Sequence, residues 1–353
     1  MREKRSTRVT SVQVAEAAGV SQATVARTFS SPHLVADSSK AKVREAAERL
    51  GYVPNAIARS LKSQRTNIVG AVVPARSEYW QHLVAEISQQ LGEQGSQLLL
   101  FTFAKPSEVA SVVESLRQYR VDGVLLASSF IDHDSLSTVA SLGIPAVAFN
   151  HPEALDVSAS VTVDNEGGAT LLARHLIETG HRSVAFVGGD PDTGSDRGRY
   201  RGASMALRAA GIVCPYISAG SFDYDAGYAI SSELVQHFGG PEQLPDALMV
   251  AGDELAFGVI DGLRAAGVVV PDDVSVTGFD GLPQASWAGF DLTTLVQPAA
   301  ELIRAALAQL SVADSERTHV SVGGFVRVGR STRRHDLQPP SSDSDQLQEG
   351  DHR

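Results

Sequence analysis

Residues 9–29 read VTSVQVAEAAGVSQATVARTF, a run in which two helix starts and one helix stop follow closely. Thr10, with Gln13 three residues later, predicts a helix start stabilised by a capping box, in which each side chain bonds an otherwise unpaired backbone N–H. Gly19 predicts the helix end, because glycine adopts the left-handed conformation without steric cost. Ser21 is suited to cap a second helix only two residues later. The pattern therefore predicts a helix-turn-helix.

The second helix of this motif carries candidate base-reading side chains. Val25 and Phe29 are four residues apart and should face inward, which leaves the polar and small residues outside: Gln22, Ala23, Ala26 and Arg27. Glutamine pairs with adenine and arginine with guanine in the major groove, whereas alanine contacts only a thymine methyl. An isolated Gln or Arg is most often a solvated helix residue. Here the motif favours base reading, because its second helix enters the groove N-terminus first.

A third helix is predicted from the apolar face Val43, Ala46, Ala47 and Leu50, and it should stop at Gly51. Ala36 cannot cap this helix, so Asp37 or Ser38 is expected to do so. Pro54 then prevents continuation, and Asn55 can cap a short helix over residues 56–62. Such a short helix is marginal in isolation and should fold only when something holds it.

The segments VTSVQVAEAAGVSQATVARTF, VREAAERLGYVPN and AIARSLKSQRTNIVGAVVP together resemble the N-terminal half of a LacI/GalR-family transcriptional regulator. The resemblance extends over roughly residues 9–330. It implies that Leu61 of the short hinge helix enters the minor groove as a wedge, where an apolar side chain can bend DNA; the alternative is a leucine that packs the helix. The candidate DNA contacts are Thr10, Ser21, Gln22, Ala23, Thr24, Arg27, Asn55, Ala58 and Leu61.

The charge distribution agrees with a DNA-binding head. Residues 1–66 hold 12 Lys/Arg and 5 Asp/Glu, a net charge of +7, whereas the remainder holds 18 and 36, a net charge of −18. A basic segment can also be an ordinary solvated face, but segregated charge of this kind is typical of a nucleic-acid-binding head on an acidic body. We therefore expect double-stranded operator DNA as a partner of the first domain, bound by a homodimer on a palindromic site.

Other features of the sequence exclude several classes of protein. No apolar run approaches the roughly 18 residues that a membrane span needs, and the basic start, residues 1–8, leads into no apolar stretch of a signal peptide. One cysteine, Cys214, argues against disulfides and zinc, so the protein is expected in the cytoplasm. The chain lacks GxxxxGK[ST], GxSxG and HExxH motifs, and Gly188-Gly189-Asp190-Pro191 lacks dinucleotide-binding spacing. We therefore expect that the protein is not an enzyme and has no catalytic residue, metal site or cofactor.

The chain from Ile68 alternates apolar runs of strand length with helical segments, which predicts parallel sheets covered on both faces. The expected fold class is an all-α helix-turn-helix head with a hinge helix, followed by a two-lobed α/β body with doubly wound sheets, like a type I periplasmic binding protein. The expected boundaries are 9–54 for the head, 55–66 for the hinge and linker, 67–332 for the effector-binding and dimerisation body, and 333–353 for a disordered tail. Within the body, 67–162 plus 294–318 should form the N-lobe and 163–293 plus 319–332 the C-lobe.

Two facing lobes of this kind bind ligands beyond the carboxyl ends of their strands. The candidate effector contacts are polar or aromatic residues at these ends: Tyr79, Trp80, Asn150, Arg199, Phe222, Asp253 and Asp280. Such a set suits a small polar molecule such as a sugar or nucleobase. The alternatives are that Trp80 packs in the core, Arg199 lies on the surface and Asp253 caps a helix.

The resemblance places Arg199 of Arg199-Tyr-Arg-Gly202 and Asp280 of Gly278-Phe-Asp280 at the effector. Two departures from the family pattern remove polar capacity there, since Asn150 stands where many relatives have aspartate and Gly252 where many have asparagine. A constitutive DNA-binding protein with a vestigial cleft therefore stays an alternative to a regulator. A solute-binding protein would carry an export signal and would lack a DNA-binding head. The sequence instead predicts a DNA-binding head and no export signal.

Overall fold

The computed structural model describes residues 9–53, 66–116, 118–127, 138–139, 141, 143–149, 159–313 and 316–333. The chain forms two compact units, one of Met1–Ile68 with Arg120–Asp122 and one of Val69–Tyr119 with Gly123–Arg353. We call residues 9–53 the head and the second unit the body. In the part of the chain that the structure describes, no helix is long and apolar enough to cross a membrane.

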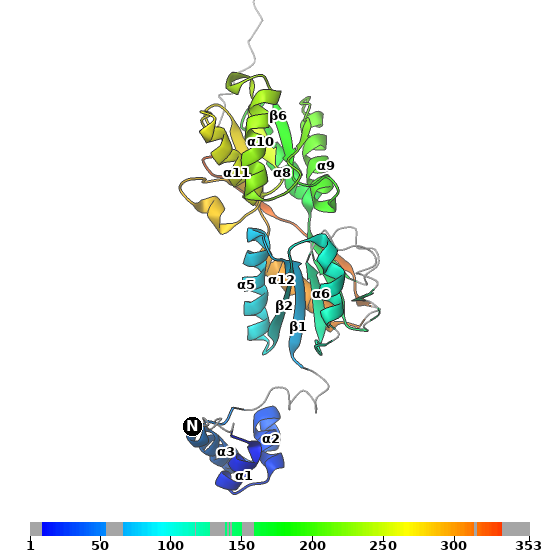
Figure 1. The fold of residues 1–353 in the computed structure, drawn as a ribbon, viewed down its shortest axis with the longest axis vertical. Helices are drawn as coiled ribbons and strands as arrows, with labels where there is room; N and C mark the ends of the chain where they lie inside the picture. Colours follow the sequence, from blue (N-terminus) through cyan, green and yellow to red (C-terminus); the bar gives the residue numbers. More distant parts are fainter. Residues whose placement is uncertain are drawn as a thin grey trace, which may run out of the picture. The chain divides into compact units, whose positions relative to one another are not determined.

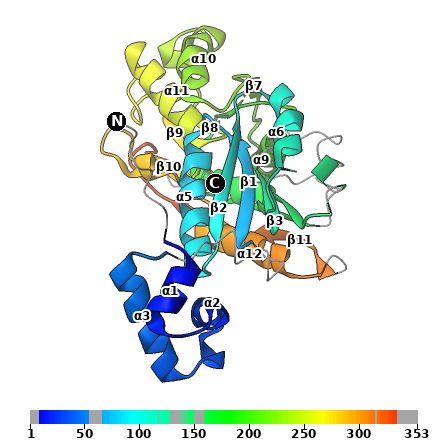
Figure 2. The same ribbon diagram turned by 60° about the horizontal axis from the view of Figure 1, so that its bottom comes forward.

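The head consists of three helices, visible together in Figure 2. They are α1 (Ser11–Ala18), α2 (Gln22–Ser30) and α3 (Asp37–Leu50), with a short 3-10 turn, η1 (Pro32–Leu34). The capping box of Thr10 and Gln13 is present, and Gly19 ends α1 at φ 64°. These features confirm the helix-turn-helix that the sequence predicts.

The core of the head is small and aliphatic. Val14, Val25 and Val43, one from each helix, have no exposed surface. Phe29 and Tyr52 close this core from one side, with ring centroids 6.0 Å apart. Deleting methyl groups from such a core costs stability in proportion to the cavity left behind.

The start of α3 differs from the prediction. Ala36 is the N-cap residue, and no side chain bonds the first turn of the helix. Asp37 instead lies inside the first turn, with its carboxylate 2.6 Å from Nζ of Lys40. The expected cap by Asp37 or Ser38 is therefore wrong, although a negative charge in the first turn still favours the helix dipole.

The N-lobe contains a six-stranded sheet with the order β11-β5-β4-β3-β1-β2. Its strands are β1 (Ile68–Pro74), β2 (Gln97–Phe103), β3 (Gly123–Ala127), β4 (Ala146–Phe149), β5 (Ser160–Val163) and β11 (His319–Val322). Alternate residues of β1 point to opposite faces: Ala71 and Val73 pack with residues of α5 (Glu78–Glu93) and α12 (Ala299–Ser311), whereas Val72 packs with residues of α6 (Val109–Leu116). In Figure 1, α5 and α6 lie on opposite sides of β1.

The C-lobe contains a second six-stranded sheet, with the order β12-β10-β9-β8-β6-β7. Its strands are β6 (Val184–Gly188), β7 (Tyr216–Ser218), β8 (Ala247–Val250), β9 (Ser275–Asp280), β10 (Thr293–Val296) and β12 (Phe325–Arg327). Helices α8 (Asn165–Glu178) and α9 (Gly194–Ala209) cover one face, and α10 (Tyr224–His237) and α11 (Asp253–Ala265) cover the other. The pairs β6–β7, β6–β8, β8–β9 and β9–β10 are parallel, and β10–β12 is antiparallel.

Two of the expected lobe boundaries are wrong. The strand at 293–296 pairs with β9 of the C-lobe, although residues from 294 onward were expected in the N-lobe. The strand at 319–322 pairs with β5 of the N-lobe, although it was expected in the C-lobe. The apolar pattern of a short strand marks it as a strand, but the sheet it joins is decided by long-range pairing. The chain therefore crosses between lobes after β5, after β10 and again after β11.

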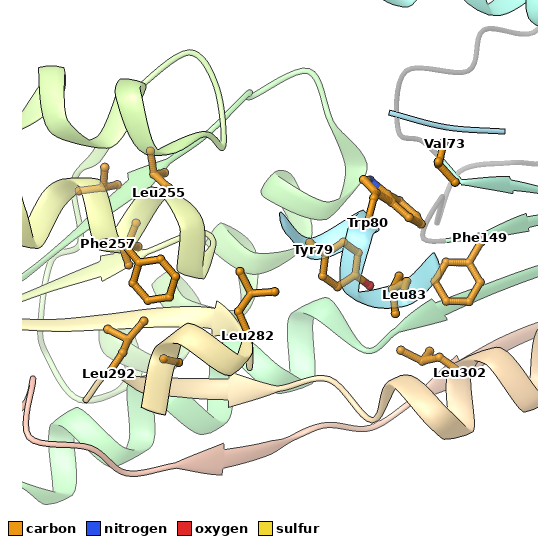
Figure 3. Packing of buried hydrophobic residues seen from close by; sticks show 14 of the residues in the cluster. Val73, Tyr79, Trp80, Leu83, Phe149, Leu255, Phe257, Leu282, Leu292 and Leu302 are labelled. Carbon is orange, nitrogen blue, oxygen red and sulfur yellow. The ribbon is translucent and has the colours of Figure 1, made fainter. Parts of the chain in front are cut away.

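One apolar cluster is continuous across both lobes, as Figure 3 shows from close by. Tyr79 and Leu83 of α5 belong to this cluster together with Leu282 and Leu292 of the C-lobe. In the picture Tyr79 lies between the N-lobe residues and Leu282. The lobes therefore share buried apolar surface at the place where the effector residues are expected.

Candidate functional site

The outward face of α2 carries the predicted base readers. Gln22, Ala23 and Arg27 are all exposed, while Val25 and Thr28 of the same helix are buried. Ser21 caps the helix, since its Oγ accepts the backbone N–H of Thr24 at 3.1 Å. The readers therefore project from a helix whose start is held by its own cap, which is the geometry that lets a second helix present its first turns to a groove.

The starts of α1 and α2 are also joined to each other. Nε2 of Gln22 donates a hydrogen bond to Oγ of Ser11 at 3.0 Å, and these are the first residues of the two helices. The hydroxyl groups of Ser21 and Thr24 lie 2.9 Å apart and share a hydrogen bond. Thr10, Ser21 and Thr24, which we expect at phosphates, thus lie at these two helix starts.

Four of the sequence-predicted residues lie outside the described residues. They are Asn55, Ala58 and Leu61 of the hinge and Asn150 of the effector set. Their roles remain predictions.

Arg199 is the centre of the polar network in the body. Its side chain is 4% exposed, so the alternative of a surface arginine is wrong. Nε donates to Oδ1 of Asn165 at 2.8 Å, one Nη donates to the carbonyl of Ala251, and the other lies 3.3 Å from Oδ1 of Asp280. The guanidinium also stacks over Phe279, 3.8 Å from the ring centroid. Each of its three nitrogens is therefore engaged inside the C-lobe.

Asp280 connects this network to the N-lobe through Gln297. Its Oδ1 accepts Nε2 of Gln297 at 2.6 Å, and Oε1 of Gln297 accepts the hydroxyl of Tyr79 at 2.8 Å. Burial raises the pKa of Asp280, and the neighbouring Arg199 acts against that rise. Asp280 also has φ 127°, a conformation that a non-glycine residue holds only when its surroundings fix it. The chain Arg199–Asp280–Gln297–Tyr79 thus connects the two lobes.

Asp253 makes its hydrogen bonds inside the C-lobe and not with the series Arg199–Asp280–Gln297–Tyr79. It has no exposed surface, and its carboxylate accepts the N–H of Leu282 at 2.7 Å and the hydroxyl of Thr294 at 2.5 Å. Burial, and then the charge of Asp280, raise its pKa to about 7. Gly252, not Asp253, is the N-cap of α11, so the alternative of a helix cap is wrong. These hydrogen bonds join the start of α11 to β10 and to the segment that follows β9.

The aromatic candidates differ in their surroundings. Trp80 is buried, and its ring centroid lies 5.9 Å from that of Phe149. Trp80 therefore packs in the core, which was the alternative to an effector contact. Phe222 is half-buried and lies against Gly189, where a Cβ atom would meet the ring at 2.7 Å. A Cβ atom at Gly252 would lie 3.3 Å from Oδ2 of Asp280 and 3.4 Å from the Phe222 ring. Phe222, Gly252 and Asp280 are therefore neighbours.

Sequence reasoning missed three polar residues of this region. Asn165 and Gln297 both follow strand ends, the same signal that identified Asp280, but an ordinary amide gains its role only from the partners that the fold brings to it. Glu254 accepts the backbone N–H of Glu78 at 3.1 Å, and Glu78 in turn accepts Nε2 of Gln284 at 2.8 Å. The carboxylate of Glu254 thus caps the start of α5 from the C-lobe, where Ser77, the N-cap residue of the helix, makes no side-chain cap.

Within the described residues, no group of three or more His, Cys, Asp or Glu side chains could hold a metal ion. Cys214 is buried, and burial raises the pKa of its thiol to about 12. A thiol that stays protonated is a poor nucleophile and a poor ligand.

Two family models match the chain. The model of bacterial regulatory proteins, lacI family, matches residues 12–55, which include α2, α3 and all of α1 except its first residue. The model of the periplasmic binding protein-like domain matches residues 173–323 of the body.

Relatives match over most of their length. The HTH-type transcriptional regulator CelR of Thermobifida fusca is 33% identical over 319 residues, which cover 88% of this chain and 92% of that protein. The HTH-type transcriptional regulator DegA of Bacillus subtilis (strain 168) is 31% identical over 302 residues, 84% and 88% of the two chains. The HTH-type transcriptional repressor PurR of Haemophilus influenzae (strain PittEE) is 32% identical over 301 residues, which cover 83% of this chain and 88% of that protein.

Solved structures agree in fold. A complex of the transcriptional regulator CelR with cellobiose is 30% identical, with a TM-score of 0.66 over 92% of this chain and 100% of that one. The lac repressor dimer bound to operator and the anti-inducer ONPF superimposes with a TM-score of 0.79 at 22% identity, over 93% and 100% of the chains.

Proposed function

Since the chain belongs to the LacI family of bacterial regulatory proteins, we propose that it is a homodimeric repressor that binds a palindromic operator and responds to a small polar effector between its lobes. Its relatives are transcriptional regulators, so the chain is a DNA-binding transcriptional regulator rather than an enzyme. As a protein that acts on DNA, it is proposed to work in the cytoplasm.

The observation that carries effector control is the hydrogen-bonded chain Arg199–Asp280–Gln297–Tyr79. Three of its members come from the sequence-predicted effector set, and the chain runs from the C-lobe to the first turn of α5 in the N-lobe. A ligand that displaces or extends these bonds changes how the lobes are held together. Ligands shift an equilibrium only through such differential contacts.

The occupied nitrogens of Arg199 favour a neutral effector. The positive charge of Arg199 already faces the carboxylate of Asp280 at 3.3 Å, so an anionic effector would have to compete with that carboxylate. Hydroxyl groups can instead share in a network of carboxylate, amide and phenol groups. The solved complex of CelR contains cellobiose, a neutral sugar, which supports the same class of effector here.

The size of the reading surface supports a dimer. One α2 helix presents two hydrogen-bonding base readers, Gln22 and Arg27, too few to select one site in a genome. Two heads related by a two-fold axis read two half-sites, about one helical turn apart. Effector-driven movement of the N-lobes would then fold or melt the hinge residues 55–66. By linkage, operator and effector change each other's affinity by the same factor.

A constitutive DNA-binding protein is the second candidate. It is favoured by Gly252 and by an Arg199 in which each nitrogen has a partner within the protein. A thermal-shift screen of the full chain against sugars, polyols and nucleobases separates the two, because a ligand that binds only the folded state raises the melting temperature. The regulator predicts a stabilising ligand that also changes operator affinity; the constitutive protein predicts none.

Operator selection tests the DNA half of the proposal. From a randomised pool, the full chain should enrich an inverted repeat, and adding about 5 base pairs between the half-sites should abolish tight binding by turning one half-site to the opposite face. Leu61→Ala should reduce operator affinity and bending while the effector-induced thermal shift persists. Selection of an asymmetric site, or unchanged bending with Leu61→Ala, would contradict the dimer or the wedge respectively.

A further inference from the structure

Asp122 holds the chain immediately before the first strand of the N-lobe. Its Oδ1 accepts the backbone N–H of Thr66 at 2.8 Å and the Thr66 hydroxyl at 3.0 Å, and its Oδ2 accepts the N–H of Asn67 at 2.7 Å. The next residue, Ile68, begins β1. One carboxylate thus receives three donors from the two residues that precede β1.

Hydrogen bonds rather than apolar packing fix this segment. Asn67 is exposed and Thr66 is half-buried, and full burial begins only at Val69. Asn67 has φ 54°, a left-handed conformation that is uncommon outside glycine and that asparagine tolerates best among the others. Hydrogen bonds to a charged acceptor are stronger than neutral ones. The carboxylate of Asp122 therefore fixes the direction of the backbone at the start of β1.

The C-lobe contains the same arrangement. Oδ2 of Asp246 accepts the N–H groups of Arg182 and Ser183 at 2.7 and 3.0 Å. Asp246 is the residue before β8, and Ser183 is the residue before β6. In the N-lobe Asp122 likewise precedes β3, and Asn67 precedes β1. Both strand pairs, β1–β3 and β6–β8, are parallel, so in each lobe a carboxylate before one strand holds the start of its neighbour.

The two carboxylates differ in the chain that they hold. The segment at Asp246 arrives from α8, which covers the sheet of the same lobe. The segment at Asp122 arrives from the head through residues 54–65. A clamp at this second place holds a strand start, as Asp246 does, and it also fixes the point to which the head is tethered.

We propose that Asp122 is a positioning residue that sets the half-site separation of the operator, because it fixes the point and the direction in which the chain leaves the body toward the head. This inference rests on the proposed operator binding by a homodimer. When two heads are tethered to one dimer, the second head binds at an effective concentration that depends on the length and stiffness of the tether.

Loss of the clamp lengthens each tether. Freed from Asp122, Thr66 and Asn67 add up to about 7 Å of reach for each head. This is about the rise of two base pairs at roughly 3.4 Å each. A dimer without the clamp should therefore accept neighbouring half-site separations that the wild type rejects.

The test is selection from a DNA pool in which two inverted half-sites, taken from the wild-type operator, are separated by spacers of different length. The full-length wild type should enrich one separation. In Asp122→Ala, the preference for that separation over those about two base pairs longer or shorter should fall about fivefold or more. Asp246→Ala is the matched control, because it removes the equivalent clamp without releasing the chain to the head. It should lower the melting temperature and keep the wild-type preference.

Thr66 provides a second pair of variants, which decides the question if Asp122→Ala does not fold. Thr66→Val keeps the size of the side chain but removes the hydroxyl, which donates to Asp122 and accepts the N–H of Ile68 at 3.2 Å. It should broaden the preference less than Asp122→Ala does, since both backbone N–H bonds remain. Thr66→Ser keeps the hydroxyl and should keep the wild-type preference.

Three results would overturn the inference. They are equal binding of several separations by the wild type, an unchanged preference in the Asp122 and Thr66→Val variants that fold, and equal broadening in Asp246→Ala. If the wild type still enriches an inverted repeat, operator binding stands and only the role of Asp122 is wrong. If the wild type enriches no inverted repeat, the proposed homodimeric function fails, and the inference fails with it.

Discussion

The head and the body present their candidate functional residues in opposite ways. On the head, Gln22 and Arg27 are exposed, and the core beneath them is made of other residues, such as Val25. In the body, Arg199 and Asp253 are buried and bonded to the residues around them. The candidate functional side chains are therefore separate from the folding core in the head and part of the buried structure in the body.

The difference follows from what each part must recognise. DNA is an external surface, so its readers must project from a scaffold that folds without them. A small effector that controls lobe movement must be surrounded by groups that also hold the lobes, so that binding and conformation are coupled. Substitutions of the exposed base-reading candidates in the head should alter binding alone, whereas substitutions of the buried candidates in the body should alter stability as well.

The largest effect is expected from Arg199→Met. Methionine keeps much of the apolar stem but leaves the carboxylate of Asp280 buried without its cation, which typically costs about 3–5 kcal/mol. Denaturant unfolding of the body should show this loss. Arg201→Met is the control on the same helix, because Arg201 is 65% exposed and lies 3.7 Å from Glu166, a surface pair worth about 0–1 kcal/mol. Equal losses in both variants would contradict a structural role for Arg199.

Overpacking between the helices of the body should reduce stability nearly as much as the loss of the Arg199–Asp280 ion pair. A Cβ atom at Gly258 of α11 would lie 2.1 Å from the carbonyl oxygen of Tyr224 in α10, so Gly258→Ala should cost about 1–3 kcal/mol through overpacking. Gly92 of α5 is the matched helical glycine, with no atom within 4 Å of its Cβ position. Gly92→Ala should stabilise by about 0.5–1 kcal/mol. Thermal melts with the same sign for both variants would contradict this packing.

For the head, Arg27→Ala should change binding and leave stability alone. Loss of a bidentate base contact costs about 1–3 kcal/mol of discrimination, and preference at one operator position should relax. Arg44→Ala, on the exposed face of α3, removes the same charge and should weaken binding without changing the base preferred at any position. A lower melting temperature for Arg27→Ala would contradict the separation of function from folding in the head.

The head was largely predictable from sequence because its signals are local. Thr10 with Gln13, Gly19 and Ser21 each define a helix end within four residues, and all of them occur as predicted. The failure at the start of α3 has the same origin. Asp37 has the right chemistry for a cap but lies one position too late, inside the helix, where its partner is Lys40.

The body was predictable as alternating strands and helices, but not in its long-range pairing. The sequence identifies the strand at 319–322 only weakly, and nothing local tells that it pairs with β5, about 160 residues earlier in the chain. Gln297 and Glu254 were missed for a related reason. An ordinary glutamine and glutamate gain their roles only from the partners that the fold brings to them, Tyr79 and Glu78.

An effect of pH is expected as well, and it should be confined to the body. Burial raises the pKa of Glu254 to about 7, and burial together with Asp280 does the same for Asp253. In the unfolded chain these carboxyl groups return to about 4. Between about pH 4.5 and 7 the folded body therefore holds protons that the unfolded chain has released, and the free energy of unfolding falls as pH rises through this window.

Calorimetry should accordingly give a higher melting temperature at pH 5.5 than at pH 8. The Asp37 carboxyl of the head has its pKa lowered by Lys40, so it titrates below this window and adds nothing to the effect. Glu254→Gln removes an acid that is costly to ionise but keeps an acceptor for the Glu78 N–H. This variant should equal wild type at pH 5.5 and exceed its melting temperature at pH 8, whereas Glu242→Gln, on an exposed turn, should match wild type at both. If the melting temperature of Glu254→Gln at pH 8 equalled that of wild type, the carboxyl of Glu254 would be well solvated. The buried polar network of the body would then not include Glu254 at the edge of the lobe contact.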